Sequence, residues 1–192
     1  MNGREQPSFP FGGRLSLDLT WTVRYRAVLP TELLVEPDHL RQWLEAVDLP
    51  APATPTKRDL SRVKELREAI YRAAEATLDA RSIAAADLGI INRFAAHAPP
   101  APVLGPHGRR TVVAPIGRAV AASLSAVARD AIDLLAGGND GRLRRCAGSQ
   151  CSLLFHDASR PGARRWCDTA RCGNRVNTKA YRRRLTSDAP SP

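Results

Sequence analysis

The chain has 192 residues, enough for one ordinary domain with a small appendage and too few for a large multidomain enzyme. Hydrophobic residues make up 43% and charged residues 25%, which excludes a chain that is disordered throughout. The 29 Lys and Arg against 19 Asp and Glu give a net charge of +10. Residues 141–192 hold 12 basic and 3 acidic side chains, so this segment alone carries +9. We expect a nearly neutral body and a basic end that meets nucleic acid or another anionic surface.

Two segments of the chain bear on export and membrane insertion. Residues 1–10 contain no apolar run and so do not form a secretory signal. The most apolar stretch, 119–136, is interrupted by Arg129, Asp130 and Asp133, which excludes a membrane span. The protein is therefore expected to be soluble and cytoplasmic, without a membrane partner.

The first two elements differ in their hydrophobic period. Leucines at alternate positions of 15–19, followed by Trp21, predict a half-buried strand at 15–21. From Pro37 the spacing changes to three and four, which predicts a short helix whose inner face carries Leu40, Trp43, Leu44 and Val47. A proline-rich connector, 49–55, follows.

The rest of the body is predicted to be mainly helical. Thr56 and Asp59 form a variant capping box at the start of a long helix. A further helix opens at Ser82 and ends before Pro99, because a proline disfavours helical geometry in the preceding residue. We expect a loop at 99–106, a short strand at 111–113, and a helix from about 116 to 136 that stops at Gly137 and Gly138.

The fold class is thus mainly α with a few short strands (α+β). We divide the chain into a helical domain at 1–140, a small finger at 141–186 and a flexible tail at 187–192, with a hinge at 139–141. The body contains no nucleotide-binding, zinc-protease or hydrolase motif, and its histidines are scattered. We therefore expect no enzyme; an enzyme with a pocket in the helical domain is the less favoured alternative.

Four cysteines dominate the basic end: Cys146, Cys151, Cys167 and Cys172. Their pattern, C-x4-C-x15-C-x4-C, supplies two pairs that can close a tetrahedron around one ion. A segment with so few large apolar side chains needs such a link to fold. We expect one structural zinc ion per chain, with disulfides or an iron–sulfur cluster as alternatives.

Around these cysteines the sequence predicts a treble-clef arrangement of knuckle, hairpin and helix. The hairpin begins at 153–155 and turns at 160–162, with Phe155 and Trp166 as a miniature core. On the last helix four basic residues fall at i, i+4, i+7 and i+8, which gathers them into one stripe: Arg175, Lys179, Arg182 and Arg183. Arg164, Arg165 and Arg171 add charge nearby, so the affinity for nucleic acid should fall with salt.

The segment 144–184 resembles the CGNR zinc finger, named for the tetrapeptide that here is residues 172–175. The shared features are the four-residue gaps, the F-x-D of Phe155 and Asp157, and the R-x-W-C that ends at Cys167. The preceding body resembles the ABATE domain of bacterial stress-induced transcription regulators at 15–22 (LSLDLTWT), 39–49, 66–76 and 128–135. Its pattern commonly has Asn near residue 21, where this chain has Trp21. The resemblance implies four zinc-binding cysteines and a DNA-binding role.

We therefore expect a transcription regulator whose finger contacts DNA phosphates through Arg164, Arg165, Lys179, Arg182 and Arg183. Asn174 and Arg175, at the start of the last helix, are the candidates for base edges. The body would form a homodimer or sense a small molecule; Asp18 and Trp21 are weak pocket candidates, with a structural strand role favoured for both. The alternative is a module that binds RNA or an acidic protein.

Overall fold

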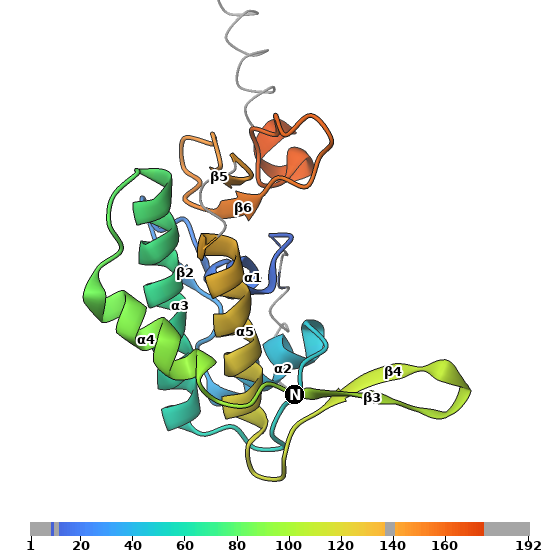
Figure 1. Cartoon of the computed structure of the whole chain (residues 1–192). Helices are drawn as coiled ribbons and strands as arrows, with labels where there is room; N and C mark the ends of the chain where they lie inside the picture. The colour runs from blue at the N-terminus through green and yellow to red at the C-terminus, as the bar shows by residue number, and fades with distance from the viewer. Residues whose placement is uncertain (1–8, 10–11, 137–140, 175–192) are drawn as a thin grey trace, which may run out of the picture.

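The computed structural model describes residues 9, 12–136 and 141–174, and these are mainly helical with a few short strands (Figure 1). This confirms the predicted fold class. Below, "the body" denotes residues 12–136 and "the finger" residues 141–174. The predicted helix stop at 137–138, most of the hinge, the stripe from Arg175 onward and the tail at 187–192 lie outside the described residues.

The predicted helices of the body are confirmed. They are α2 (Pro37–Ala46), α3 (Lys57–Leu78), α4 (Ala85–Ala95) and α5 (Ala119–Ala136). α4 and α5 each begin three residues later than predicted. The capping box is present at α3: the Asp59 N–H donates to the Thr56 hydroxyl at 3.1 Å, and the Thr56 N–H donates to the Asp59 carboxylate at 3.0 Å.

The predicted strand at 15–21 is wrong, because Leu15–Thr20 forms a short helix, α1. This helix packs against α3, α5 and the finger, so Ser16 and Thr20 are buried as fully as Leu17 and Leu19. The hydroxyl of Ser16 bonds to the Asp130 carboxylate, and that of Thr20 to the Leu17 carbonyl. Since α1 is enclosed on several sides, its apolar positions do not follow the period of one exposed helix face.

The core of the body lies where α3, α4 and α5 meet, closed at one end by α2. Its largest fully buried side chains include Trp43, Phe94, Ile70 and Leu124. Two short strands, β1 (Val23–Arg24) and β2 (Thr31–Glu32), form a small antiparallel pair beside it. None of the helices in the described part of the chain is long and apolar enough to cross a membrane.

A hairpin projects from the body next to α5 (Figure 1). The predicted strand at 111–113 is confirmed as β4 (Arg110–Val113), but the predicted loop at 99–106 is wrong in part, since Ala101–Leu104 forms β3. β3 and β4 pair antiparallel, with Pro102 opposite Val112. Proline is tolerated in β3 because this strand lies at an edge. We call residues 101–113 "the arm".

The finger lies at the end of the body away from the arm (Figure 1). Its strand β6 (Leu154–His156) was expected to pair across a turn at 160–162; it pairs instead with β5 (Leu143–Arg145), across the first cysteine knuckle. The reason lies in residues 157–164, which wrap around the buried carboxylate of Asp157 and do not run back as a strand. A single π-helical turn, Thr169–Gly173, carries the last cysteine.

Candidate metal centre and basic groove

The four cysteine sulfurs converge on one point. All of them lie within 4.8 Å of one another, and the Sγ of Cys167 is 3.7 Å from those of Cys151 and Cys172. A disulfide would require about 2.05 Å, so these cysteines are not paired covalently. Four sulfurs at the usual Zn–S distance of about 2.3 Å from one ion lie about 3.8 Å apart. The observed spacing therefore fits a tetrahedral zinc.

The first knuckle is shaped by short backbone contacts. The N–H of Cys146 donates to the Leu153 carbonyl at 3.0 Å, and that of Cys151 donates to the Gly148 carbonyl at 2.8 Å. A Cβ on Gly148 would lie 3.1 Å from the Cys151 Cβ and 3.5 Å from the Cys172 sulfur. Any larger residue at this position would therefore push Cys151 aside by a few tenths of an ångström.

The second knuckle is tied to the first. The Ala147 N–H donates to the Arg165 carbonyl at 2.9 Å, and the Cys167 N–H points at the Cys146 sulfur at 3.4 Å. Cys172 closes the π-helical turn through its N–H to the Asp168 carbonyl. Two chain segments thus present their thiols to a common centre, as the spacing of the cysteines predicted.

The thiols influence one another strongly. Hydrogen bonds from Cys151 and Cys167, together with the Cys167 N–H, lower the pKa of Cys146 to about 2. The pKa of Cys151 is raised to about 12 because its proton is held by Cys146. Such a set shares protons among close sulfurs, and a bound metal ion takes the place of those protons.

A small core packs beside the cysteines. Phe155, Leu153 and Cys167 are buried there, and Trp166 packs against them, which confirms the predicted contact of the two aromatic residues with the centre. The carboxylate of Asp157, also buried, accepts hydrogen bonds from the Ser159 hydroxyl and the N–H groups of Ser159 and Arg164. The Ser159 hydroxyl, followed by these amides, lowers the pKa of Asp157 to about 2. The F-x-D motif is therefore structural.

The two weak pocket candidates of the body lie in different surroundings. Trp21 is 2% exposed and belongs to the core of the finger, where its indole donates to the Leu154 carbonyl. The cavity beside Trp21 and Cys151 has about 30 Å³, room for one or two water molecules and not for an effector. Asp18 accepts the N–H of Gly12, and burial raises its pKa to about 6, with a further contribution from Asp130. A ligand role for either residue stays a prediction.

Further polar contacts join body and finger. The Arg145 guanidinium bonds to Glu75 on α3 at 2.9 Å and to Asp79, the residue that follows α3, at 3.2 Å. Ser152 is held from two sides, since its hydroxyl accepts the Arg26 N–H and its carbonyl accepts the Tyr71 hydroxyl. Together with Trp21, these contacts fix how the finger sits on α1 and α3.

An open groove of about 420 Å³ runs between the end of α3 and the finger. Four of its lining residues are arginines: Arg144, Arg145, Arg164 and Arg165. Arg164 and Arg165 were singled out from the sequence, whereas Arg144 and Arg145 were not. The alternation in Arg142-Leu143-Arg144, with Leu143 buried, is the sequence signal that could have found Arg144.

Two of these arginines are committed to the fold. Arg164 donates to the carbonyls of Trp166 and Cys167 and lies over the Phe155 ring, and Arg144 donates to the Gly162 carbonyl. Arg165 is exposed, and its guanidinium carbon lies 5.3 Å from the centre of the Trp166 ring. No ion pair is seen for Arg165 within the described ranges. Of the other predicted contacts, Asn174 is exposed, and nothing is described of the Arg171 side chain.

Fold and site together define a helical domain followed by a four-cysteine zinc finger. Residues 13–138 match the ABATE family, described as "Putative stress-induced transcription regulator", and residues 142–185 match the CGNR zinc finger. The chain belongs to the ABATE family, and both resemblances seen in the sequence are confirmed. No curated protein was found to match the chain. The finger match and the converging sulfurs assign one structural zinc ion to the four cysteines.

Proposed function

We propose that this protein is a bacterial, cytoplasmic transcription regulator that binds DNA mainly through phosphate contacts made by its zinc finger. The observation that carries the proposal is the groove with four arginines, which is built on a metal-held frame. Clustered guanidinium groups suit phosphate oxygens because they present several donors in a fixed plane. Both families that match the chain, a regulator family and a zinc finger, agree with this role.

Within the groove, Arg165 is the leading candidate for a phosphate contact. Its guanidinium stacks on Trp166, which orients it, and no carboxylate is described as its partner. Arg164 and Arg144 donate hydrogen bonds to backbone carbonyl groups, and Arg145 forms an ion pair with Glu75 of α3. These three shape the groove and add positive potential to it, whereas the Arg165 guanidinium has no carboxylate partner among the residues that the structure describes.

The predicted contacts on the last helix remain part of the proposal. Lys179, Arg182 and Arg183 would extend the phosphate contacts, with Arg171 nearby, and Asn174 and Arg175 would face the base edges. One finger buries limited area on DNA, so specificity is expected to need two copies of the chain. The body would supply that self-association, or respond to a small molecule.

The test is fluorescence anisotropy with zinc-saturated protein and labelled duplex DNA over a range of salt concentrations. Each phosphate contact contributes a slope of about 0.9 in log K against log salt. Arg165→Glu should weaken binding at least tenfold and lower the slope by about one contact. Arg58→Glu, an exposed change of the same charge at the start of α3, is the matched control and should change affinity far less.

Competition with structured RNA and with heparin separates the alternatives. We expect duplex DNA to compete best at physiological salt. Preference for RNA would move the assignment to an RNA-binding module. Indifference of the zinc-saturated protein to every nucleic acid would refute the proposal and favour an acidic protein as the partner of the groove.

A further inference from the structure

The arm is unusually open to solvent. Every residue of β3 is exposed, and among its apolar side chains Leu104 is 78% and Val103 41% exposed. On β4, Val113 is 47% exposed, and Ile116, just past the strand, is fully exposed. An isolated two-stranded hairpin is marginally stable in water and needs a further packing partner. The arm projects away from the body, so the body does not supply that partner (Figure 1).

The hydrogen-bond pattern of the hairpin follows from its turn. The Gly105 N–H donates to the Arg109 carbonyl at 2.7 Å, and antiparallel pairs alternate between hydrogen-bonded and non-hydrogen-bonded. Counting from Gly105, the pair Val103–Thr111 is hydrogen-bonded, and the pair Pro102–Val112 is not. Pro102 therefore costs the hairpin no bond, but it removes a donor from the outer edge of β3.

The outer edge of β4 has no such block. At Arg110 and Val112, the non-hydrogen-bonded positions, N–H and carbonyl groups point away from β3. These groups form an open edge on which another extended strand can pair. Along the paired strands, the side chains on one face of the hairpin are Ala101, Val103, Thr111 and Val113, none of them charged, and Arg109 follows on this face at the tip. Both features suit a protein strand better than a nucleic acid.

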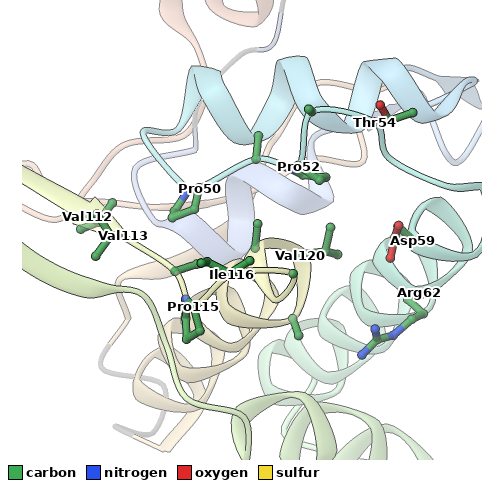
Figure 2. A pocket seen from close by; sticks show the side chains of 16 residues that line it. Pro50, Pro52, Thr54, Asp59, Arg62, Val112, Val113, Pro115, Ile116 and Val120 are labelled. Atoms are coloured by element: carbon green, nitrogen blue, oxygen red, sulfur yellow. The ribbon is translucent and has the colours of Figure 1, made fainter.

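A groove of about 740 Å³ lies at the base of the arm. It is lined by the connector with Pro50 and Pro52, by Val113 and Ile116, and by the start of α5 at Val120. Figure 2 shows Ile116 between the end of β4 and α5, with Asp59 and Arg62 of α3 on the far side. The base of the arm thus offers apolar surface, and so does the opposite end of β3 with Leu104.

We propose that this surface binds a second copy of the chain: the β4 strands of two molecules pair antiparallel, with Thr111 opposite the partner's Thr111. This register places Arg110 opposite the partner's Val112, so the open N–H and carbonyl groups at both positions are paired and no like charges stand opposite each other. The central row becomes Thr111 and Val103 with their twofold mates, β-branched residues that suit a sheet.

The same register explains why the occupant is a second copy. Because the arms run antiparallel, the tip of each, near Leu104, lies beside the base of the other, near Ile116. The exposed side chains of Val113 and Ile116 at the base of each arm are then brought next to the tip of the partner's arm, and the twofold axis makes both contacts alike, as an isologous interface requires. This pairing rests on the proposed function, which includes self-association of the body. It identifies the arm as the surface through which two copies associate.

The first test is the mass of the zinc-saturated full chain by sedimentation equilibrium. A dimer is expected for the natural sequence. Val112→Pro removes only an outward donor, as Pro102 does on β3, and should raise the dimer dissociation constant at least tenfold. Thr111→Glu, which places two like charges opposite each other at the twofold axis, should act likewise. Val35→Glu, at a side chain 60% exposed elsewhere on the body, is the matched control and should leave the dimer intact.

The second test fixes the register. Opposite residues of a non-hydrogen-bonded antiparallel pair have Cα atoms about 4.5 Å apart, within disulfide range. Thr111→Cys in zinc-saturated protein should therefore give a disulfide-linked dimer with oxidised glutathione. Ala101→Cys, which the register places on an outer strand, should not. This crosslink decides the question even if Val112→Pro lowers the stability of the arm.

A monomer at high micromolar concentration, or a dimer that Val112→Pro and Thr111→Glu both leave intact, would overturn the pairing. A monomer whose DNA affinity falls on Val112→Pro would assign the arm to nucleic acid and overturn it too. DNA binding by a monomeric chain through Arg165 would leave the proposed function of the finger standing. The two failures are thus separable.

Discussion

The indole Nε1 of Trp21 donates a hydrogen bond of 2.5 Å to the carbonyl of Leu154, although the two residues are 133 positions apart. Trp21 ends α1 in the body, and Leu154 begins β6 in the finger. Because Trp21 packs in the same small cluster as Cys146 and Cys167, the metal centre is joined to the end of α1. The finger is therefore held against the helices and is more than an appended module.

We expect Trp21→Phe to lower the free energy of unfolding by about 2 kcal/mol, because it leaves the buried Leu154 carbonyl without its donor. Urea denaturation of zinc-saturated protein measures this. Trp43→Phe is the matched control: Trp43 is fully buried, but its Nε1 has no hydrogen-bond partner among the described residues. A loss at Trp43 equal to that at Trp21 would contradict the role of the hydrogen bond.

Cys167→Ser should abolish stoichiometric zinc binding and destabilise the finger by several kcal/mol, because three thiolates no longer close the tetrahedron. Metal analysis of the purified protein should give about one zinc ion per chain for the natural sequence and well below one for the variant. The helical signal in circular dichroism should mostly persist, since the core between α3 and α5 is separate from the cysteines.

Removing zinc from the natural chain with a chelator should reproduce the effect of Cys167→Ser, and adding zinc back should reverse it only for the natural chain. Less than half an equivalent of zinc in the natural protein, with oxidised cysteines, would show that the centre is not a zinc site.

The Asp18 carboxyl predicts a dependence of stability on pH. Its pKa is about 6 in the folded protein, above the value of about 3.9 expected in an unfolded chain. Between these values the folded state binds more protons, so the contribution of this group to stability falls as pH rises from about 4 to about 6. Asp18→Asn should remove this fall and stabilise the protein at pH 7, by about 1 kcal/mol because the carboxyl is partly exposed.

Urea denaturation at several pH values measures this difference. Asp133→Asn, at an exposed position on α5, is the matched control for Asp18→Asn. Only the Asp18 variant should show a flatter profile. A profile parallel to that of the natural protein would mean that the Asp18 carboxyl does not titrate in this range.

Arg67 is buried, 4% exposed, and both terminal nitrogens of its guanidinium bond to Glu32 at 2.7 Å. Arg67→Met removes both of these hydrogen bonds, leaves Lys64 at 3.6 Å as the cation beside Glu32, and should cost about 2–4 kcal/mol in urea denaturation. Arg41→Met removes an exposed pair with Asp38 and Glu45 on α2 and should have a much smaller effect. Equal effects would show that burial does not strengthen the Arg67 pair.

Local patterns in the sequence were sufficient where the interacting groups are close along the chain. The capping box needs only Thr56 and Asp59, and the zinc centre needs only four thiols at suitable spacing. α1 could not be predicted in this way. Its leucines alternate as in a strand, but they lie on a helix that is enclosed by α3, α5 and the finger, so several of its faces are apolar. β3 was missed because Pro102 normally indicates a loop, and its tolerance depends on which hydrogen-bond position it occupies.

The candidate site shows the same limit. A run of arginines indicates a basic surface, but it does not tell which guanidinium groups are used by the fold. Arg164 donates to the carbonyls of the second knuckle and Arg145 pairs with Glu75 of α3, while Arg165 contacts the Trp166 ring and has no ion pair among the described residues. Likewise, the sequence gives no sign that Trp21 belongs to the finger, since that contact spans most of the chain.

Pro102 has a consequence for the size of any assembly that the arms form. Pairing through β4 would use the open edge of each copy and leave the two β3 edges on the outside. Each β3 edge is interrupted at Pro102, whose tertiary amide nitrogen carries no hydrogen and cannot donate. A third strand would find an incomplete ladder there. A sheet formed by two such arms would therefore end at the β3 edges and would not propagate into a fibre.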